Sequence, residues 1–343
     1  MLDEVIQLDK KYYLNTFGDR LPVCFEKGEG MKLFDDKGNT YYDFLGGIAV
    51  NALGHGHKDF INALKNQLDK VVHTSSLYYI ENQAKLAQKL VENTCAEKAF
   101  FANSGAEANE GAFKLAKIYY YKKGLDKYEI ITLDKSFHGR TLATVAATGQ
   151  EKYQKPYRPL TPGFKQVEPN NFKAIEDAVT DKTAASMIEL IQGESGVHPM
   201  DKEYVEKLRK LCDEKDIILI FDEVQTGMGR TGYLFAHQMY GVEPDIFTSA
   251  KAAVFRLVRY VRAKRLRLHL NRVTMEQHSA VIRSQRQLDW LCLIFLKRNI
   301  LLKMQVRWVS ILKKKTLYST PHIVQDWFLV LHLQRFCIWA YLP

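Results

Sequence analysis

Residues 217–225 read I-I-L-I-F-D-E-V-Q, an all-apolar run that ends in two carboxylates. A short, continuous apolar run of this kind is typical of a strand that is buried on both faces of a parallel sheet. Asp222 and Glu223 stand where that strand ends. Ligands of open α/β sheets bind beyond the carboxyl ends of the strands. The stretch therefore predicts a parallel α/β sheet with a functional site at this edge.

Strand and helix patterns alternate along the residues that precede this stretch. A hairpin is expected over Met31–Phe44, with its turn at Asp36–Asn39. The expected strands are Lys98–Phe101, Glu129–Leu133, Ala185–Ile191, Ile217–Phe221 and Asp245–Thr248. The expected helices are Lys58–Leu68, Asn82–Glu92, a helix from the loop at 103–105 to about Tyr121, Phe172–Val179 and Lys202–Lys215. This alternation predicts an α/β fold with a mostly parallel sheet.

The composition of the chain changes after Lys251. The whole chain has a formal charge of +10, which would favour a nucleic-acid or membrane partner. Residues 252–343, however, hold 17 Lys and Arg against three acids, so the remaining 251 residues are slightly acidic. All 20 glycines lie before residue 252 and all four tryptophans lie after it. The basicity therefore belongs to the last quarter of the chain alone.

Cysteine usage and apolar runs bear on the compartment and on metals. The five cysteines form no C-x-x-C pair and no metal spacing, which fits a reducing compartment. His55 and His57 lack a third ligand at a sensible spacing, so no metal site is expected. The acidic start is no secretory signal, and Trp290–Leu296 is too short to span a membrane. We expect a cytoplasmic protein.

Besides the strand-end acids, two further segments contain residues that could bind a ligand or react with one. N-S-G-A-E-A-N-E at 103–110 turns from a strand into a helix, whose first amides form an anion site typical of phosphate. The alternative is an ordinary N-cap by Ser104. Lys251 follows small residues at a strand end, where desolvation would lower its pKa and allow imine chemistry. The alternative is a surface lysine.

The remaining candidate site residues are Asp222, at the end of the strand, and residues in the two loops at 136–141 and 192–196. Asp222 could pair with a cationic ring nitrogen, hold Mg²⁺ or cap the next turn, and no Walker-A lysine motif supports the magnesium role. S-F-H-G-R-T at 136–141 offers an aromatic ring to stack on a flat ligand and an arginine to grip a carboxylate. The alternative there is a buried Phe beside a solvated Arg. Q-G-E-S-G at 192–196 places an acid near the same edge.

The order of these motifs resembles the class III aminotransferases, pyridoxal-phosphate enzymes of fold type I. The matching segments are N-S-G-A-E-A-N-E, S-F-H-G-R-T, Q-G-E-S-G, F-D-E-V-Q-T-G-M-G-R-T-G and S-A-K, with the lysine 29 positions after Asp222. The resemblance runs from about Leu8 to Lys251. It implies an α/β fold with helices on both faces of a mostly parallel sheet, and pyridoxal 5'-phosphate as the cofactor. Residues 1–50 would belong to a smaller domain and residues 51–251 to a cofactor-binding large domain.

The resemblance assigns the chemistry to residues around the cofactor ring. Lys251 would bond covalently to the cofactor and move the proton between the substrate α-carbon and the cofactor. Asp222 would keep the ring nitrogen protonated, so that the ring draws electrons from the substrate. Gln225 would bond the phenolic oxygen of the cofactor. Val224 and Phe137 would pack on its two faces.

The same resemblance implies binding roles at the edge of the site. Gly105 and Ala106, with Ser104 nearby, would cradle the cofactor phosphate. Arg140 would bind the substrate α-carboxylate, and Glu194 would act as the switch acid that admits 2-oxoglutarate. A δ-amino donor would leave its nitrogen on the cofactor, and 2-oxoglutarate would carry it away as glutamate. N-acetylornithine is the expected donor, with succinyl-diaminopimelate, ornithine and 4-aminobutyrate as alternatives, in a homodimer.

The resemblance stops abruptly after Lys251. The family continues with a glycine run, P-I-G and later H-G-T-T-F-G-G-N-P, whereas this chain continues A-A-V-F-R-L-V-R. If the third base of each codon is read with the first two bases of the next, residues 252–276 permit G-G-F-P-I-G-A-L-C-A-S-E-A-A-S-A-S-L-E-P-G-D-H-G. Residues 277–283 then permit T-T-F-G-G-N-P. We therefore interpret residues 252–343 as an out-of-frame tail without a native fold, produced by a short deletion near codon 252.

This interpretation predicts a damaged protein. The C-terminal part of the smaller domain, the H-G-T-T-F segment and the last strands of the large domain would be lost. The exposed sheet edge would favour aggregation, and transaminase activity would be impaired. A competing interpretation is that the basic run from Arg256 to Arg267 binds RNA or anionic lipid, although charge runs alone specify little. A third is an inactive pseudoenzyme that retains the cofactor.

Overall fold

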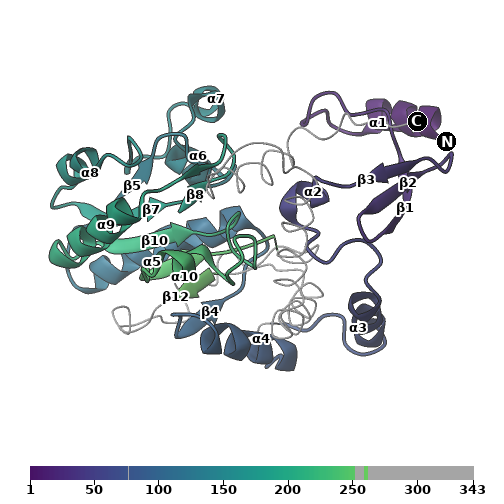
Figure 1. Cartoon of the computed structure of the whole chain (residues 1–343). Coiled ribbons are helices and arrows are strands. Elements are labelled where there is room, and N and C mark those ends of the chain that lie inside the picture. The colour runs from purple at the N-terminus through teal and green to yellow at the C-terminus, as the bar shows by residue number, and fades with distance from the viewer. Residues whose placement is uncertain (76, 252–258, 262–343) are drawn as a thin grey trace, which may run out of the picture.

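The computed structural model describes residues 1–75, 77–251 and 259–261. The chain begins with helix α1 (Leu2–Tyr12), which is followed by an antiparallel sheet of β1 (Phe25–Glu29), β2 (Lys32–Asp35) and β3 (Thr40–Tyr42). The expected hairpin is confirmed, because β2 and β3 pair around the turn at 36–39. Figure 1 shows this small sheet well separated from the large sheet.

The described chain forms a seven-stranded sheet in the order β4-β12-β11-β10-β7-β5-β6. Its strands are β4 (Lys98–Phe100), β5 (Glu129–Leu133), β6 (Phe164–Val167), β7 (Thr183–Ile188), β10 (Ile218–Asp222), β11 (Ile246–Thr248) and β12 (Arg259–Val261). All of the pairings are parallel except those that β12 makes with β11 and β4. The predicted mostly parallel α/β sheet is therefore confirmed.

Helices cover both faces of this sheet (Figure 1). The helices after α1 are α2 (Gly46–Ala49), α3 (Lys58–Leu68), α4 (Glu81–Glu92), α5 (Gly105–Lys122), α6 (Leu142–Ala147), α7 (Glu151–Gln154), α8 (Phe172–Ala178), α9 (Lys202–Glu214) and α10 (Ala236–Tyr240), with a short 3₁₀ turn at Lys155–Tyr157. The expected helices at 58–68, 82–92, 105–121, 172–179 and 202–215 are confirmed to within one residue at each end.

Strand β10 shows why an all-apolar run suits the centre of such a sheet. Side chains alternate between the two faces of a strand. Ile218 and Ile220 pack into the cluster that α5 covers, whereas Leu219 and Phe221 pack into the cluster that α9 covers. Each of these four side chains is fully buried. Both faces therefore require apolar residues, and the carboxylates come only where the strand ends.

The expected strand over Ala185–Ile191 is wrong at its C-terminal end. Strand β7 begins at Thr183 and stops at Ile188. Residues Ile191–Gln192 (β8) instead pair antiparallel with His198–Pro199 (β9). The buried Glu189 breaks the apolar run between the two strands. Its carboxylate binds a neighbouring loop, so the chain leaves the sheet at this point.

One strand of the large sheet follows the lysine, in a part of the chain for which sequence analysis expected the family's last strands to be lost. The backbone of Arg259–Val261 forms β12, which runs antiparallel between β11 and β4. Without this segment, two neighbouring strands would each present unpaired N–H and C=O groups, which a third strand can satisfy. The pairing uses only backbone atoms, so it makes little demand on the sequence.

Other expectations for residues 252–343 lie outside the described residues. These are the out-of-frame tail and the basic run, except for the backbone of β12. Within the described ranges, no helix is long and apolar enough to cross a membrane. No cluster of three His, Cys, Asp or Glu in those ranges could hold a metal ion.

Candidate active site

Asp222 is the last residue of β10 and is 3% exposed. Its Oδ2 lies 2.8 Å from Asn109 Nδ2 and 2.8 Å from His138 Nδ1. Its Oδ1 accepts a hydrogen bond from the backbone amide of Val224 at 3.0 Å. These partners come from three separate parts of the chain, and together they fix both oxygens of a carboxylate that is shielded from water.

Asn109, from the second turn of α5, is the bridge that sequence analysis did not assign. Besides contacting Asp222, its Nδ2 donates to the carbonyl of His138 at 2.7 Å. Its Oδ1 accepts from the hydroxyl of Thr248 at 2.6 Å. A buried amide with every hydrogen bond made holds its neighbours in one arrangement. Asn109 therefore joins α5, the loop at 136–141 and β11 around one carboxylate.

Lys251 follows β11 with a left-handed backbone, at a φ of 59°. Its Nζ donates a hydrogen bond to Oε1 of Gln225. Burial lowers the pKa of the Lys251 amine, and nearby Arg230 lowers it further, whereas Asp222 and Glu194 act in the opposite direction. A lysine whose charge is disfavoured supplies neutral amine, the form that attacks carbonyl groups. The surface-lysine alternative is not supported.

The N-terminus of α5 packs tightly against the loop that follows β10. A Cβ at Gly105 would lie 2.9 Å from Cγ1 of Val224, so the close approach requires a glycine. Ser104 caps the helix by accepting from the amide of Glu107 at 3.1 Å. The cap leaves the first amides of the helix, at Gly105 and Ala106, without an intrahelical acceptor. The N-cap alternative and the anion site are thus compatible.

The loop at 136–141 is tied to the site through a buried acid. The backbone amide of Phe137 donates to Oε2 of Glu189 at 2.9 Å. Glu189 is 5% exposed, and burial together with the charge of Asp222 raises its pKa well above the usual value. Sequence analysis missed Glu189, because it lies within a run read as one continuous strand. The same loop reaches α5, since a Cβ at Gly139 would lie 2.7 Å from Cβ of Ala106.

Tyr153, from α7, contacts three of the predicted site residues. Its ring lies edge-on to Phe137, with centroids 5.4 Å apart. Its hydroxyl donates to Oε1 of Glu194 at 3.1 Å. The guanidinium of Arg140 lies 5.9 Å from the ring centroid, and the side chain of Arg140 is exposed. Tyr153 was not predicted, since α7 has only four residues and no motif marks it.

The predicted residues therefore gather at one edge of the sheet, linked by side-chain contacts or by the packing of α5. Arg140 is the most peripheral of them. The chemistry of the set fits pyridoxal phosphate: a buried amine for its aldehyde, a buried carboxylate for its ring nitrogen and a helix N-terminus for its phosphate. Among the described residues, a metal cluster is absent from this edge.

The comparisons with known proteins define the class. Residues 13–254 match the family described as aminotransferase class III. The chain therefore belongs to the class III aminotransferase family, as the motifs predicted. The family uses pyridoxal phosphate, so the expected cofactor is that of the family. The match ends three residues after Lys251.

Two individual relatives carry a more specific name than the family does. The acetylornithine aminotransferase of Methanocaldococcus jannaschii is 55% identical over 248 residues, which are 72% of this chain and 62% of the relative. The one from Caldanaerobacter subterraneus is 52% identical over 248 residues, 72% of this chain and 63% of the relative. The chain thus spans under two thirds of the length of these relatives.

Solved structures agree with the fold. The ornithine aminotransferase of Toxoplasma gondii ME49 is 27% identical, with a TM-score of 0.83, covering 94% of this chain and 78% of that one. The adenosylmethionine-8-amino-7-oxononanoate aminotransferase of M. jannaschii is 27% identical, with a TM-score of 0.82, covering 92% and 79%. The predicted fold class is thereby confirmed.

Proposed function

We propose that this chain carries the catalytic half of an aminotransferase that moves the δ-amino group of N-acetylornithine to 2-oxoglutarate. The observation that carries the proposal is the buried amine of Lys251, close enough to the fixed carboxylate of Asp222 for that charge to act on its pKa. The relatives that match at 47–55% identity are named acetylornithine aminotransferases, which favours this amine donor.

Each residue around the cofactor ring would have its own role. Asp222, held by Asn109 and His138, would keep a proton on the cofactor ring nitrogen. Gln225 would hold the phenolic oxygen, and Val224 and Phe137 would bound the ring. When bound, pyridoxal phosphate supplies an electron sink for the C–H bond broken at the carbon that bears the transferred amino group. A fixed buried carboxylate does this without reorganisation, which is the main electrostatic contribution of such sites.

Lys251 would move a proton at the substrate carbon that bears the transferred amino group, which is Cδ in N-acetylornithine, because its neutral amine is favoured by burial. Gly105 and Ala106, with Ser104 nearby, would bind the phosphate through the start of α5. Arg140 would bind the substrate α-carboxylate, and its place over the ring of Tyr153 supports an orienting contact. Glu194, held by Tyr153, would act as the switch acid between the two substrates.

The test of cofactor binding is borohydride trapping in the purified full chain mixed with pyridoxal phosphate. We expect imine absorbance, and a reduced adduct that peptide mass spectrometry places on Lys251. The matched control is Lys117→Ala, since burial also lowers the pKa of Lys117, on α5. Lys251→Ala should abolish the adduct and Lys117→Ala should preserve it. If the adduct still forms in the Lys251→Ala variant, the proposal is wrong.

The amine donor needs a separate test, in a chain whose residues after Lys251 follow the family sequence. Glutamate formation from 2-oxoglutarate is measured with N-acetylornithine, ornithine, succinyl-diaminopimelate and 4-aminobutyrate. We expect the largest kcat/KM for N-acetylornithine. A larger value for ornithine would move the assignment to the class named for the Toxoplasma structure.

A further inference from the structure

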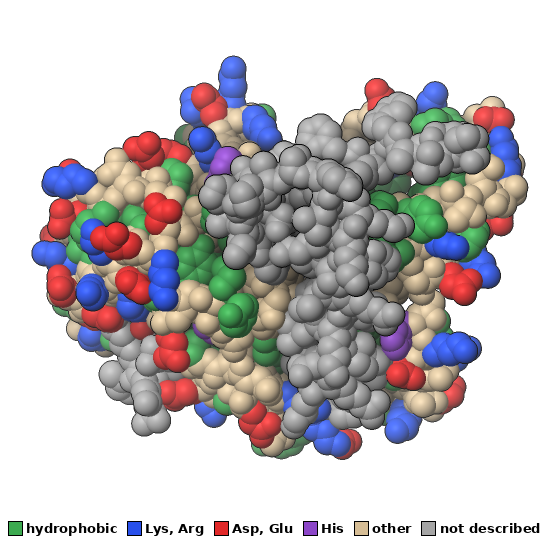
Figure 2. Space-filling view, in the orientation of Figure 1, with side chains coloured by type: hydrophobic (Ala, Val, Ile, Leu, Met, Phe, Trp, Pro, Cys, Tyr) green, Lys and Arg blue, Asp and Glu red, His purple; other side chains and the backbone are tan. Residues whose placement is uncertain are grey.

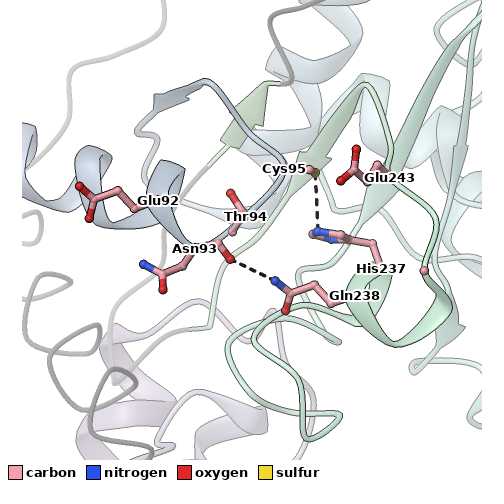
Figure 3. A pocket seen from close by; sticks show the side chains of 8 residues that line it. Glu92, Asn93, Thr94, Cys95, His237, Gln238 and Glu243 are labelled. Carbon is pink, nitrogen blue, oxygen red and sulfur yellow. Dashed lines mark hydrogen bonds between the residues drawn. The ribbon is translucent and has the colours of Figure 1, made fainter.

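A second group of reactive side chains lies away from the candidate active site. Cys95, just before β4, points toward His237 at the start of α10, and both line a pocket of about 390 Å³ (Figure 3). The Sγ of Cys95 lies 3.6 Å from Nε2 of His237. On the other side of the ring, Nδ1 lies 2.7 Å from Oε1 of Glu223. The thiol of Cys95, the imidazole of His237 and the carboxylate of Glu223 therefore form a chain of contacts.

Glu223, at one end of this chain of contacts, is held in place by several hydrogen bonds. Glu223 is fully buried and also accepts hydrogen bonds from the backbone amides of Ala236 and His237. The ring of His237 stacks on Phe235, with centroids 5.8 Å apart. A histidine held in this way has one ring orientation and one nitrogen left for the thiol. The arrangement is that of a nucleophile beside a histidine whose ring is oriented by a carboxylate.

The protonation of His237 supports the same conclusion. Burial lowers the pKa of the ring, but the hydrogen bonds to Cys95 and Glu223 and their charges outweigh it and raise the pKa to about 9. The ring is therefore a cation at neutral pH. A cation beside a sulfur stabilises the negative charge that the sulfur carries when it attacks.

The geometry excludes a shared metal ion. The two nitrogens of His237 point in opposite directions, so Cys95 and Glu223 do not converge on one centre. In the described ranges, no three His, Cys, Asp or Glu form a metal cluster. Besides Cys95 and the cationic His237, the pocket is lined by two acids, Glu92 and Glu243, and by neutral residues, so acids outnumber cations. This lining favours a small ligand that carries positive charge.

We propose that Cys95 is a nucleophilic site that forms mixed disulfides with small disulfides bearing an amino group. The sulfur of Cys95 attacks one sulfur of the disulfide, a new S–S bond forms, and the old S–S bond breaks. The other half leaves as a thiolate and takes up the proton that the thiol of Cys95 loses. One thiol and one disulfide thus yield one mixed disulfide and one thiol, with no further oxidant.

The test uses the full chain without added cofactor, so it is independent of transaminase activity. Cystamine is the cationic disulfide and 3,3'-dithiodipropionate the anionic one, and peptide mass spectrometry follows each cysteine. Cys24 is the internal reference, because it is partly exposed. With cystamine at pH 6, we expect Cys95 to react at least about fivefold faster than Cys24, because the cationic ring of His237 lies beside the sulfur of Cys95. The ratio should fall as the pH rises to 9.

Two variants separate the parts of the proposal. His237→Gln should bring Cys95 to the rate of Cys24, whereas the control His198→Gln, at an exposed histidine, should leave it unchanged. The double variant Glu92→Gln, Glu243→Gln should remove the preference of Cys95 for cystamine. If His237→Gln fails to fold, the pH series on the unaltered chain decides. A Cys95 to Cys24 ratio that is constant from pH 6 to 9, or no preference for the cation, overturns the proposal.

Discussion

Residues 98–251 bury most of their large apolar side chains, whereas residues 1–79 leave many of theirs in solvent. Helix α5 has nine buried residues, whereas α1 has none. Phe221, in β10, is fully buried, whereas Phe17 is 66% exposed. Some of the exposed apolar side chains are visible around β1–β3 at the right of Figure 2. Most of the large apolar side chains that the described chain exposes belong to residues 1–79.

The difference points to a surface that other protein would cover. Many exposed large apolar side chains in one region are typical of an interaction surface. The match to the family ends at residue 254. We propose that a frame shift after Lys251 removed a C-terminal portion that, together with a second subunit, would cover residues 1–79.

The largest expected effect comes from restoring the reading frame after Lys251. Covering residues 1–79 should place the substrate-binding residues correctly, and small misplacements can cost about 100-fold in rate. We therefore expect turnover at least about 100-fold above that of the present chain, measured as glutamate formed. Lys251→Ala in the restored chain is the control and should remove the activity. Equal turnover in both chains, or an intact genomic reading frame through codons 249–255, would refute the frame shift.

The next effect compares one substitution in the two regions. Phe221→Ala removes a fully buried ring from the centre of the sheet, and we expect a loss of about 3–5 kcal/mol in the free energy of unfolding. Phe17→Ala removes an exposed ring and should change it by less than about 0.5 kcal/mol. Urea denaturation of both variants measures the difference. Similar losses would mean that residues 1–79 are packed in solution.

The smallest effect is a pH dependence that belongs to residues 98–251. His237 has a pKa of about 9 in the folded chain against about 6.5 when unfolded. Only the folded chain holds that proton between these values, so the stabilisation is complete below pH 6.5 and lost as the pH rises through 9. At about 1.4 kcal/mol per pKa unit, the loss is up to about 3 kcal/mol. Thermal unfolding from pH 6 to 9.5 measures it, and His237→Gln should flatten the curve.

Much of the large sheet was predictable because its signals are local. The apolar run at 217–221 and the helix at 58–68 have their own periodicity and end signals. The strand around Glu189 was misjudged, because a buried acid within an apolar run looks like a continuation of the strand. β12 was missed since its pairing depends on two strands far away in the sequence, not on its own residues.

The site was predictable where motifs supply chemistry, and not where tertiary packing supplies support. Asp222 and Lys251 stand at strand ends, a position that sequence shows. Asn109 contacts Asp222 across 113 residues, and no local pattern reports such a contact. A polar residue on an otherwise apolar helix face was the available signal for Asn109. Tyr153 had no comparable signal, because only its position in space gives it a role.

The backbone of Lys251 has a consequence for how this position would evolve. A φ of 59° is unfavourable for any residue with a Cβ, and costs of order 1–3 kcal/mol where it occurs. Glycine adopts this conformation freely, and asparagine more easily than most residues. In a laboratory lineage selected for heat resistance alone, position 251 should drift toward glycine or asparagine. Only a requirement for the amine would hold lysine there.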